Sequence, residues 1–201
     1  MAKNKQKATL NSRDILGKKT LILGEAGTGK TRLVAKLLQE LMVLINPEKI
    51  TIIDLAPKKV SGIGGKITDH VSMPPEVRYL SPTNVYAPRL TGTSPEEILH
   101  YATLNKRAME PLFNKYIQNA TEALVVNDVT LYLHAGNLET ISKCARLANT
   151  FLATAYYGSR LEKDLGTGIS SREKQLTDEL AALMNLVVRI GQSTRILSGE
   201  L

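Results

Sequence analysis

The sequence predicts an α/β protein of the three-layer P-loop NTPase class, with a mainly parallel sheet covered by helices on both faces. Short apolar, β-branched runs alternate with longer segments in which apolar residues recur every three or four positions. The first apolar run leads into a glycine-rich loop, in KKTLILGEAGTGKTRLVAKLL. Strands that are apolar along their whole length are typical of parallel sheets buried on both faces.

Five buried strands are expected, and they lie at residues 20–24, 50–54, 123–128, 150–157 and 185–191. VRYL, at 77–80, predicts a further short strand, and STRIL, at 193–197, is expected to pair back as an edge hairpin. Because helical patterns separate the buried strands, the connections are crossovers and the strands should run parallel.

Helices are expected over 33–45, from 94 to about 119, over 138–149 and from 170 onward. The second should be kinked or broken near Pro111, because proline cannot donate the helical hydrogen bond. The third places Cys144 on its apolar face, so this cysteine is expected in the core. Residues 55–93 show little regular pattern, and a stretch of this length inside a compact domain usually has a functional role.

Composition limits the class of protein. The chain has 201 residues, enough for one domain at 18–201 preceded by a basic, flexible tail at 1–17. No apolar run approaches the ~20 residues of a membrane span, so no membrane association is expected. The single cysteine excludes an internal disulfide and fits a cytoplasmic location. A net charge of +7 permits an anionic partner such as DNA, and equally an ordinary basic surface.

The segment GEAGTGKT matches the pattern G-x-x-x-x-G-K-[ST] between a strand and a helix. Glycines let backbone N–H groups turn toward phosphate oxygens, Lys30 supplies a cation for the outer phosphates, and Thr31 offers a hydroxyl to Mg²⁺. We therefore expect ATP and Mg²⁺ as cofactors. The expected nucleotide-binding residues are Gly24, Glu25, Ala26, Gly27, Thr28, Gly29, Lys30, Thr31 and Arg32.

An acidic residue at the end of another strand should hold the Mg²⁺, and two strands end in one. Asp128 ends the more apolar strand, about a hundred residues after the loop, and is preferred. Asp54 stays open as the alternative metal-side residue, or as a strand-end cap.

The chain resembles RecA-like P-loop ATPases, nearest to the HerA–FtsK group of DNA-pumping and packaging ATPases. GEAGTGKT carries the resemblance most specifically, and IIDLAPKK, LVVND and FLATAYY follow in the order of that group's strands. The resemblance implies a RecA-like sheet, ATP hydrolysis coupled to work on DNA, and a homo-oligomer, perhaps a ring. It implies Lys30, Asp128 and an arginine as catalytic residues.

Two positions depart from the pattern of that group. Val129 follows Asp128 where the group has a water-activating glutamate, and Ala155 replaces a glutamine. The replacements considered for the missing base are Glu25, Asp54 and Glu139. The first candidate for an arginine supplied to a neighbouring subunit is Arg160, and Arg172 is the second.

Other features leave alternatives open. Lys58, Lys59 and Lys66 could contact DNA phosphates or simply be solvated, and Tyr156 and Tyr157 could stack on bases or end a strand half-buried. A small-molecule or nucleotide kinase remains the second reading, with SRLEKDLGTGISSREK as its lid. A non-hydrolytic nucleotide-dependent switch is the third, and a GTPase is disfavoured because no Asn-Lys-x-Asp segment is present.

Overall fold

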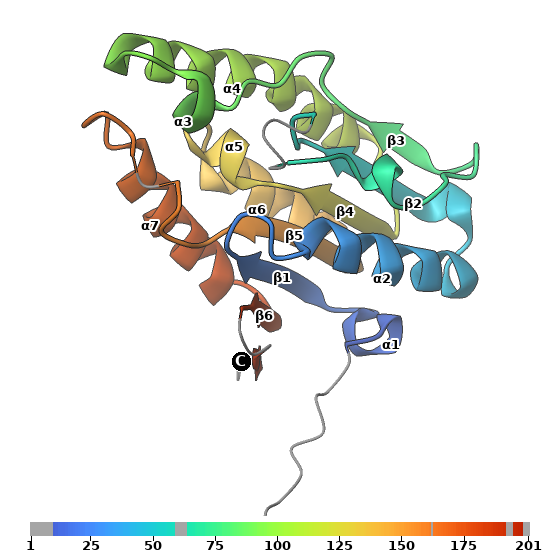
Figure 1. Ribbon diagram of the computed structural model, residues 1–201. Helices are drawn as coiled ribbons and strands as arrows, with labels where there is room; N and C mark the ends of the chain where they lie inside the picture. Colours follow the sequence, from blue (N-terminus) through green and yellow to red (C-terminus); the bar gives the residue numbers. More distant parts are fainter. Residues whose placement is uncertain (1–9, 59–63, 162, 192–194, 199–201) are drawn as a thin grey trace, which may run out of the picture.

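The protein is built around one seven-stranded sheet, shown in the computed structural model of Figure 1, which describes residues 10–58, 64–161, 163–191 and 195–198. The strand order is β3-β2-β4-β5-β1-β6-β7. The first six strands in chain order pair in parallel, and β7 pairs antiparallel with β6. The strands are β1 (Lys19–Gly24), β2 (Ile50–Asp54), β3 (Arg78–Leu80), β4 (Ala123–Asn127), β5 (Thr150–Tyr156), β6 (Leu186–Ile190) and β7 (Arg195–Ser198).

Helices cover both faces of the sheet, as predicted for a three-layer α/β protein. The helices are α1 (Ser12–Ile15), α2 (Lys30–Leu44), α3 (Pro88–Thr91), α4 (Pro95–Gln118), α5 (Thr130–Leu133), α6 (Leu138–Leu147) and α7 (Ile169–Ala182), with 3₁₀ turns at Pro47–Lys49 and Ile67–Asp69. None of the helices in the described ranges is long and apolar enough to cross a membrane.

Alternating side chains of the strands divide the core in two. Ile22 of β1 packs with α1 and α2 on one face, whereas its neighbours Leu21 and Leu23 pack in the cluster formed with α4 to α7. Cys144 is fully buried in that second cluster, as predicted, and burial raises the pKa of its thiol to about 12.

β5 lies between β1 and β4, so one strand separates the strand of the glycine loop from the strand that precedes Asp128. This is the order expected from the resemblance. The carboxyl ends of these three parallel strands meet at the same edge of the sheet, which is where α/β proteins bind ligands. The predicted strands at 77–80 and within 193–197 are also present, as β3 and β7.

Three local features differ from the expectations. Residues 10–17 pack rather than form part of a tail: Ile15 is fully buried, and the Ser12 N–H donates to Glu40 of α2 at 2.8 Å. Residues 1–9 lie outside the described residues. α4 runs continuously through Pro111, and α7 begins at Ile169, after Gly168, rather than at a serine cap.

Candidate nucleotide-binding site

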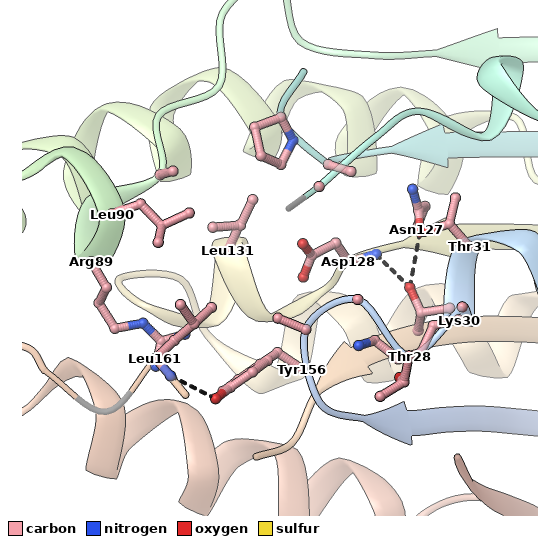
Figure 2. A pocket seen from close by; sticks show the side chains of 18 of the residues that line it. Thr28, Lys30, Thr31, Arg89, Leu90, Asn127, Asp128, Leu131, Tyr156 and Leu161 are labelled. Atoms are coloured by element: carbon pink, nitrogen blue, oxygen red, sulfur yellow. Dashed lines mark hydrogen bonds between the residues drawn. The ribbon is translucent and has the colours of Figure 1, made fainter. Parts of the chain in front are cut away.

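A cavity of about 270 Å³ opens at the carboxyl ends of β1, β4 and β5. On one side it is lined by Ala26 to Arg32, the glycine loop and first turn of α2. Figure 2 shows Asp128 between the loop residue Lys30 on one side and Arg89, Leu90, Leu131 and Leu161 on the other, with Asn127 next to Thr31. Residues 26–32 of the loop predicted to bind nucleotide therefore form one wall of this cavity, whereas Gly24 and Glu25 do not line it.

The glycines of the loop are required by its geometry. A Cβ on Gly24 would lie 2.6 Å from the Ile190 carbonyl oxygen, a contact too close for any side chain. Gly27 and Gly29 have φ angles of 76° and 89°, in the left-handed region that favours glycine. Gly24 does not line the cavity. Because it has no side chain, the loop can turn tightly beside β6.

Lys30 closes the loop on itself. Its Nζ donates to the carbonyl oxygens of Gly24 at 2.7 Å and Glu25 at 2.9 Å. Burial lowers the pKa of this ammonium, and the carboxylates of Asp128, Glu25 and Glu173 oppose that effect. A partly desolvated cation at the end of a glycine-rich loop is suited to binding phosphate oxygens.

Asn127, rather than Asp128, is the side chain that lies against Thr31. Its Oδ1 accepts a hydrogen bond from the Thr31 hydroxyl at 3.5 Å and another from the Thr154 hydroxyl at 3.0 Å. Its Nδ2 donates to Asp54 at 2.9 Å. Asn127 is the last residue of β4, and the sequence analysis did not single it out.

Asp128 turns away from Asn127 and into the cavity (Figure 2). Its φ of 62° is left-handed, a conformation that aspartate and asparagine adopt more readily than other side chains. The backbone N–H donates to Thr154 at 2.8 Å, and the carboxylate accepts from the Thr130 hydroxyl at 2.5 Å. Burial raises the pKa of Asp128, although Thr130 and Lys30 act in the opposite direction.

Asp54 lies outside the cavity and is fully buried. One carboxylate oxygen accepts from the Ile67 N–H at 2.7 Å and the Tyr79 hydroxyl at 2.8 Å, and the other accepts from Asn127. Asp54 is therefore held by hydrogen bonds at the end of β2, and it does not contact Thr31.

The other acidic candidates have different surroundings. Burial alone would raise the pKa of Glu25, but the N–H groups of Ala26, Arg160 and Ser159 outweigh it and lower the pKa. Two of these bonds, 2.8 Å from Ser159 and 3.1 Å from Arg160, tie the segment after β5 to the glycine loop. Glu139 forms an exposed pair with Arg146 and does not line the cavity.

The arginine and tyrosine candidates differ in exposure. Arg160 is exposed and does not line the cavity, and its backbone N–H donates to Glu25 of its own chain's glycine loop. Arg172 donates hydrogen bonds to the carbonyl oxygens of Leu133 and Gly136, and these bonds hold the connection between α5 and α6. Tyr156 is buried, and its hydroxyl accepts from the Leu161 N–H at 2.9 Å, so it packs as part of the wall.

The lysines after β2 do not form one exposed group. Lys66 is partly buried and donates to the Asp54 carbonyl oxygen at 3.0 Å and the Ser81 hydroxyl at 2.8 Å. Burial lowers its pKa. Lys58 is exposed, and Lys59 lies outside the described residues.

The opposite wall contains residues that sequence reasoning missed. Arg89 of α3 pairs with Glu173 of α7, 84 positions away in sequence, and His134 at the end of α5 contacts the same carboxylate. No local pattern could have joined them. Among the described residues, no group of three or more His, Cys, Asp or Glu side chains is placed to hold a metal ion by itself. A magnesium ion here would need substrate phosphates among its ligands, which is its usual mode of binding.

The chain matches one family model and is similar to solved structures. The model of the family described as the central domain of the helicase HerA matches residues 1–196. The flagellar accessory protein FlaH from Methanocaldococcus jannaschii is 10% identical with a TM-score of 0.49, over 90% of this chain and 78% of that chain. A Pyrococcus horikoshii OT3 protein, solved as project PH0250, is 9% identical with a TM-score of 0.46, over 96% of this chain and 94% of that chain. No curated protein matches the sequence.

The family match spans almost the whole chain, including the glycine loop and every strand of the parallel sheet. This protein belongs to the HerA central-domain family of RecA-like P-loop ATPases.

Proposed function

We propose that the protein is a Mg²⁺-dependent ATP hydrolase in which Asp128 activates the attacking water. One observation carries this proposal: two neighbouring side chains point to different places. Asn127 contacts Thr31 at 3.5 Å, whereas Asp128 turns into the cavity. Asn127 thus stands where a metal-side residue is needed, and Asp128 takes the place of the base that Val129 cannot provide.

The residues present fit both cofactors. The glycine loop and the start of α2 line one wall, and a helix N-terminus at a glycine-rich loop suits a triphosphate. Thr31 and Asn127 offer neutral oxygens on the metal side, which suit Mg²⁺ with phosphate oxygens and water as further ligands. Bound Mg²⁺ would supply positive charge against the outer phosphates. Lys30 would exchange its two carbonyl partners for phosphate oxygens.

The environment of Asp128 suits a general base. Its raised pKa brings the carboxylate closer to the neutral range, where proton transfer from water is more favourable. The Thr130 hydroxyl at 2.5 Å fixes the carboxylate, and the left-handed backbone directs it away from Thr31. Asp128 can therefore orient a water molecule and accept its proton while it lies close to the side of the cavity where Mg²⁺ would bind.

We further propose that ATP hydrolysis drives work on DNA in a homo-oligomer. The family description and the net charge of +7 support this. The lysines after β2 support it less than expected, since Lys66 bonds internally. Arg160 is exposed, as an arginine that acts on a neighbouring subunit must be.

An ATPase assay with and without duplex DNA, with molecular mass measured under the same conditions, tests the proposal. Turnover should require Mg²⁺, increase with DNA and fall in Asp128→Asn, while nucleotide binding by that variant persists. DNA binding should weaken with salt, with a log–log slope of about −0.9 per phosphate neutralised. A monomer whose turnover ignores DNA would remove the DNA role, and an active Asp128→Asn would remove the assigned base.

A kinase remains the second candidate because of one observation. A second cavity of about 510 Å³ lies beside the first and shares Arg89 and Tyr156 with it. An acceptor molecule bound there would lie next to the nucleotide. Transfer of the γ-phosphate to a small hydroxylated acceptor, instead of release as inorganic phosphate, would favour this function.

A further inference from the structure

A buried cluster of Arg89, His134 and Glu173 lies opposite the glycine loop, and Arg89 and His134 of this cluster line the cavity. Glu173 Oε2 lies 2.6 Å from Arg89 Nη2 and also 2.6 Å from His134 Nε2. The side chains of Arg89, Glu173 and His134 are 6%, 4% and 1% exposed. Charged groups so deeply buried are rare unless they are paired, and here one carboxylate oxygen serves both partners.

This cluster leaves hydrogen-bonding capacity unused. The Arg89 guanidinium has five N–H groups, and within the described ranges two of them have partners, Ser170 at 3.3 Å and Glu173. His134 Nδ1 is buried without a hydrogen-bond partner in the described chain. An unpaired buried polar atom is unfavourable, so His134 Nδ1 would gain from a polar ligand in the cavity, and Arg89, which lines the same cavity, has further N–H groups to donate to that ligand.

Arg89 is also close to the groups that handle phosphate. The Tyr156 ring lies between two cations: its centroid is 5.1 Å from Arg89 Cζ and 6.0 Å from Lys30 Nζ. Burial lowers the pKa of Lys30, and the charge of Glu173 acts in the opposite direction. Burial raises the pKa of Asp128, and the charge of Glu173 raises it further. The cluster and the loop thus act electrostatically on one site.

We propose that Arg89 is an arginine of the chain's own active site, which contacts the terminal phosphate of bound nucleoside triphosphate and stabilises its charge during hydrolysis. This rests on the proposed ATP hydrolase function. Glu173 and His134 are positioning residues, because Glu173 holds both the guanidinium and the imidazole. Arg89 needs no neighbouring subunit, unlike the role proposed for Arg160.

The step balances as follows. The water oxygen bonds to the γ-phosphorus while the bond from that phosphorus to the bridging oxygen breaks. The electron pair of the broken bond goes to the departing diphosphate. The water proton passes to Asp128 and then to the phosphate product. Arg89 transfers nothing, and its guanidinium meets negative charge on the γ-phosphoryl oxygens.

The test compares Arg89→Ala and Arg89→Lys with Arg146→Ala, which removes an exposed arginine–glutamate pair outside the cavity. Arginines in this role are worth about 10³–10⁵ in rate. Arg89→Ala should therefore lower kcat at least 10³-fold, a much larger factor than its loss of ATP affinity, and Arg146→Ala should match the parent. Thermal unfolding establishes that each variant is folded. Arg89→Lys preserves the charge for Glu173 if Arg89→Ala fails to fold, and should still lose most turnover because lysine lacks the planar fork.

Binding gives a readout that does not depend on turnover. Fluorescent ATP and ADP analogues, titrated with Mg²⁺, should show that Arg89→Ala weakens ATP binding and leaves ADP binding unchanged within about twofold. A folded Arg89→Ala with parental kcat and parental ATP preference would reduce the cluster to a structural ion pair. If the parent binds ATP without hydrolysing it, the hydrolase proposal fails, and the ATP-versus-ADP comparison still decides the phosphate contact.

Mixing subunits distinguishes same-chain from neighbouring-chain action. Arg89→Ala subunits have an intact Lys30, and Lys30→Ala subunits have an intact Arg89. If Arg89 acts within its own chain, no mixture restores turnover. Recovery of activity on mixing would overturn the assignment and move Arg89 to the neighbour's site.

Discussion

Asp54→Asn tests whether the buried carboxylate at the end of β2 organises the fold or holds the metal. In the parent, two oxygens accept from Ile67, Tyr79 and Asn127 at 2.7, 2.8 and 2.9 Å. An asparagine keeps one acceptor oxygen and turns an NH₂ group toward donors on the other side. The Tyr79 hydroxyl can rotate to accept, but at least one N–H, from Ile67 or Asn127, loses its partner.

The magnitude follows from that count. A buried donor left unpaired costs about 1–3 kcal/mol, and a lost hydrogen bond to a charged group about 1.5–3 kcal/mol. We expect Asp54→Asn to lower the free energy of unfolding by about 3 kcal/mol. For a chain of this length each kcal/mol moves Tm by about 2–4 °C, so Tm should fall by about 6–12 °C.

Thermal unfolding followed by circular dichroism measures this, with Tyr79→Phe as the graded control. Phenylalanine removes one donor and leaves the other bonds of Asp54, so its loss should be about 1.5 kcal/mol, the lower end of the range for a hydrogen bond to a charged group. ATP turnover, measured well below all midpoints, should fall less in Asp54→Asn than in Asp128→Asn. A parental Tm for Asp54→Asn, together with loss of Mg²⁺-dependent activity, would refute this reasoning and place Asp54 in the metal site.

Three further predictions concern the loop and the base. Asp128→Asn should abolish turnover and raise Tm. Because burial raises the pKa of Asp128, ionising it opposes folding, and the Tm gap over the parent should widen as the pH rises above the ordinary aspartate pKa of about 3.9. A gap that narrows as the pH rises, measured by calorimetry, would contradict the sign. Gly24→Ala should lose about 1–3 kcal/mol of stability and weaken nucleotide binding, because the added Cβ would meet the Ile190 carbonyl. Gly191→Ala is the control: a Cβ there would have no atom within 4 Å, so this variant should bind nucleotide like the parent in the same titration. Lys30→Ala should weaken Mg·ATP binding or turnover with its far-ultraviolet spectrum retained, and parental ATP binding would show that the loop is not the site.

The elements could be predicted from sequence because their signals are local. Apolar runs identified five of the six parallel strands, VRYL indicated the sixth, and the loop pattern identified one wall of the cavity. The direction of single side chains could not be predicted. LVVND does not show that the strand ends at Asn127, or that a φ of 62° turns Asp128 into the cavity. The Arg89–Glu173 pair joins α3 and α7 across 84 positions, so only the folded chain brings them together.

The contact between Glu25 and the segment after β5 has a consequence for how this family can vary. The Glu25 carboxylate lies so close to Gly158 that a Cβ at that position would overlap it. The same carboxylate accepts from the Ser159 and Arg160 N–H groups. Positions 25 and 158 should therefore change together among relatives: a smaller residue at 25 would release 158 from glycine, and a larger residue at 158 would be found where glutamate is absent.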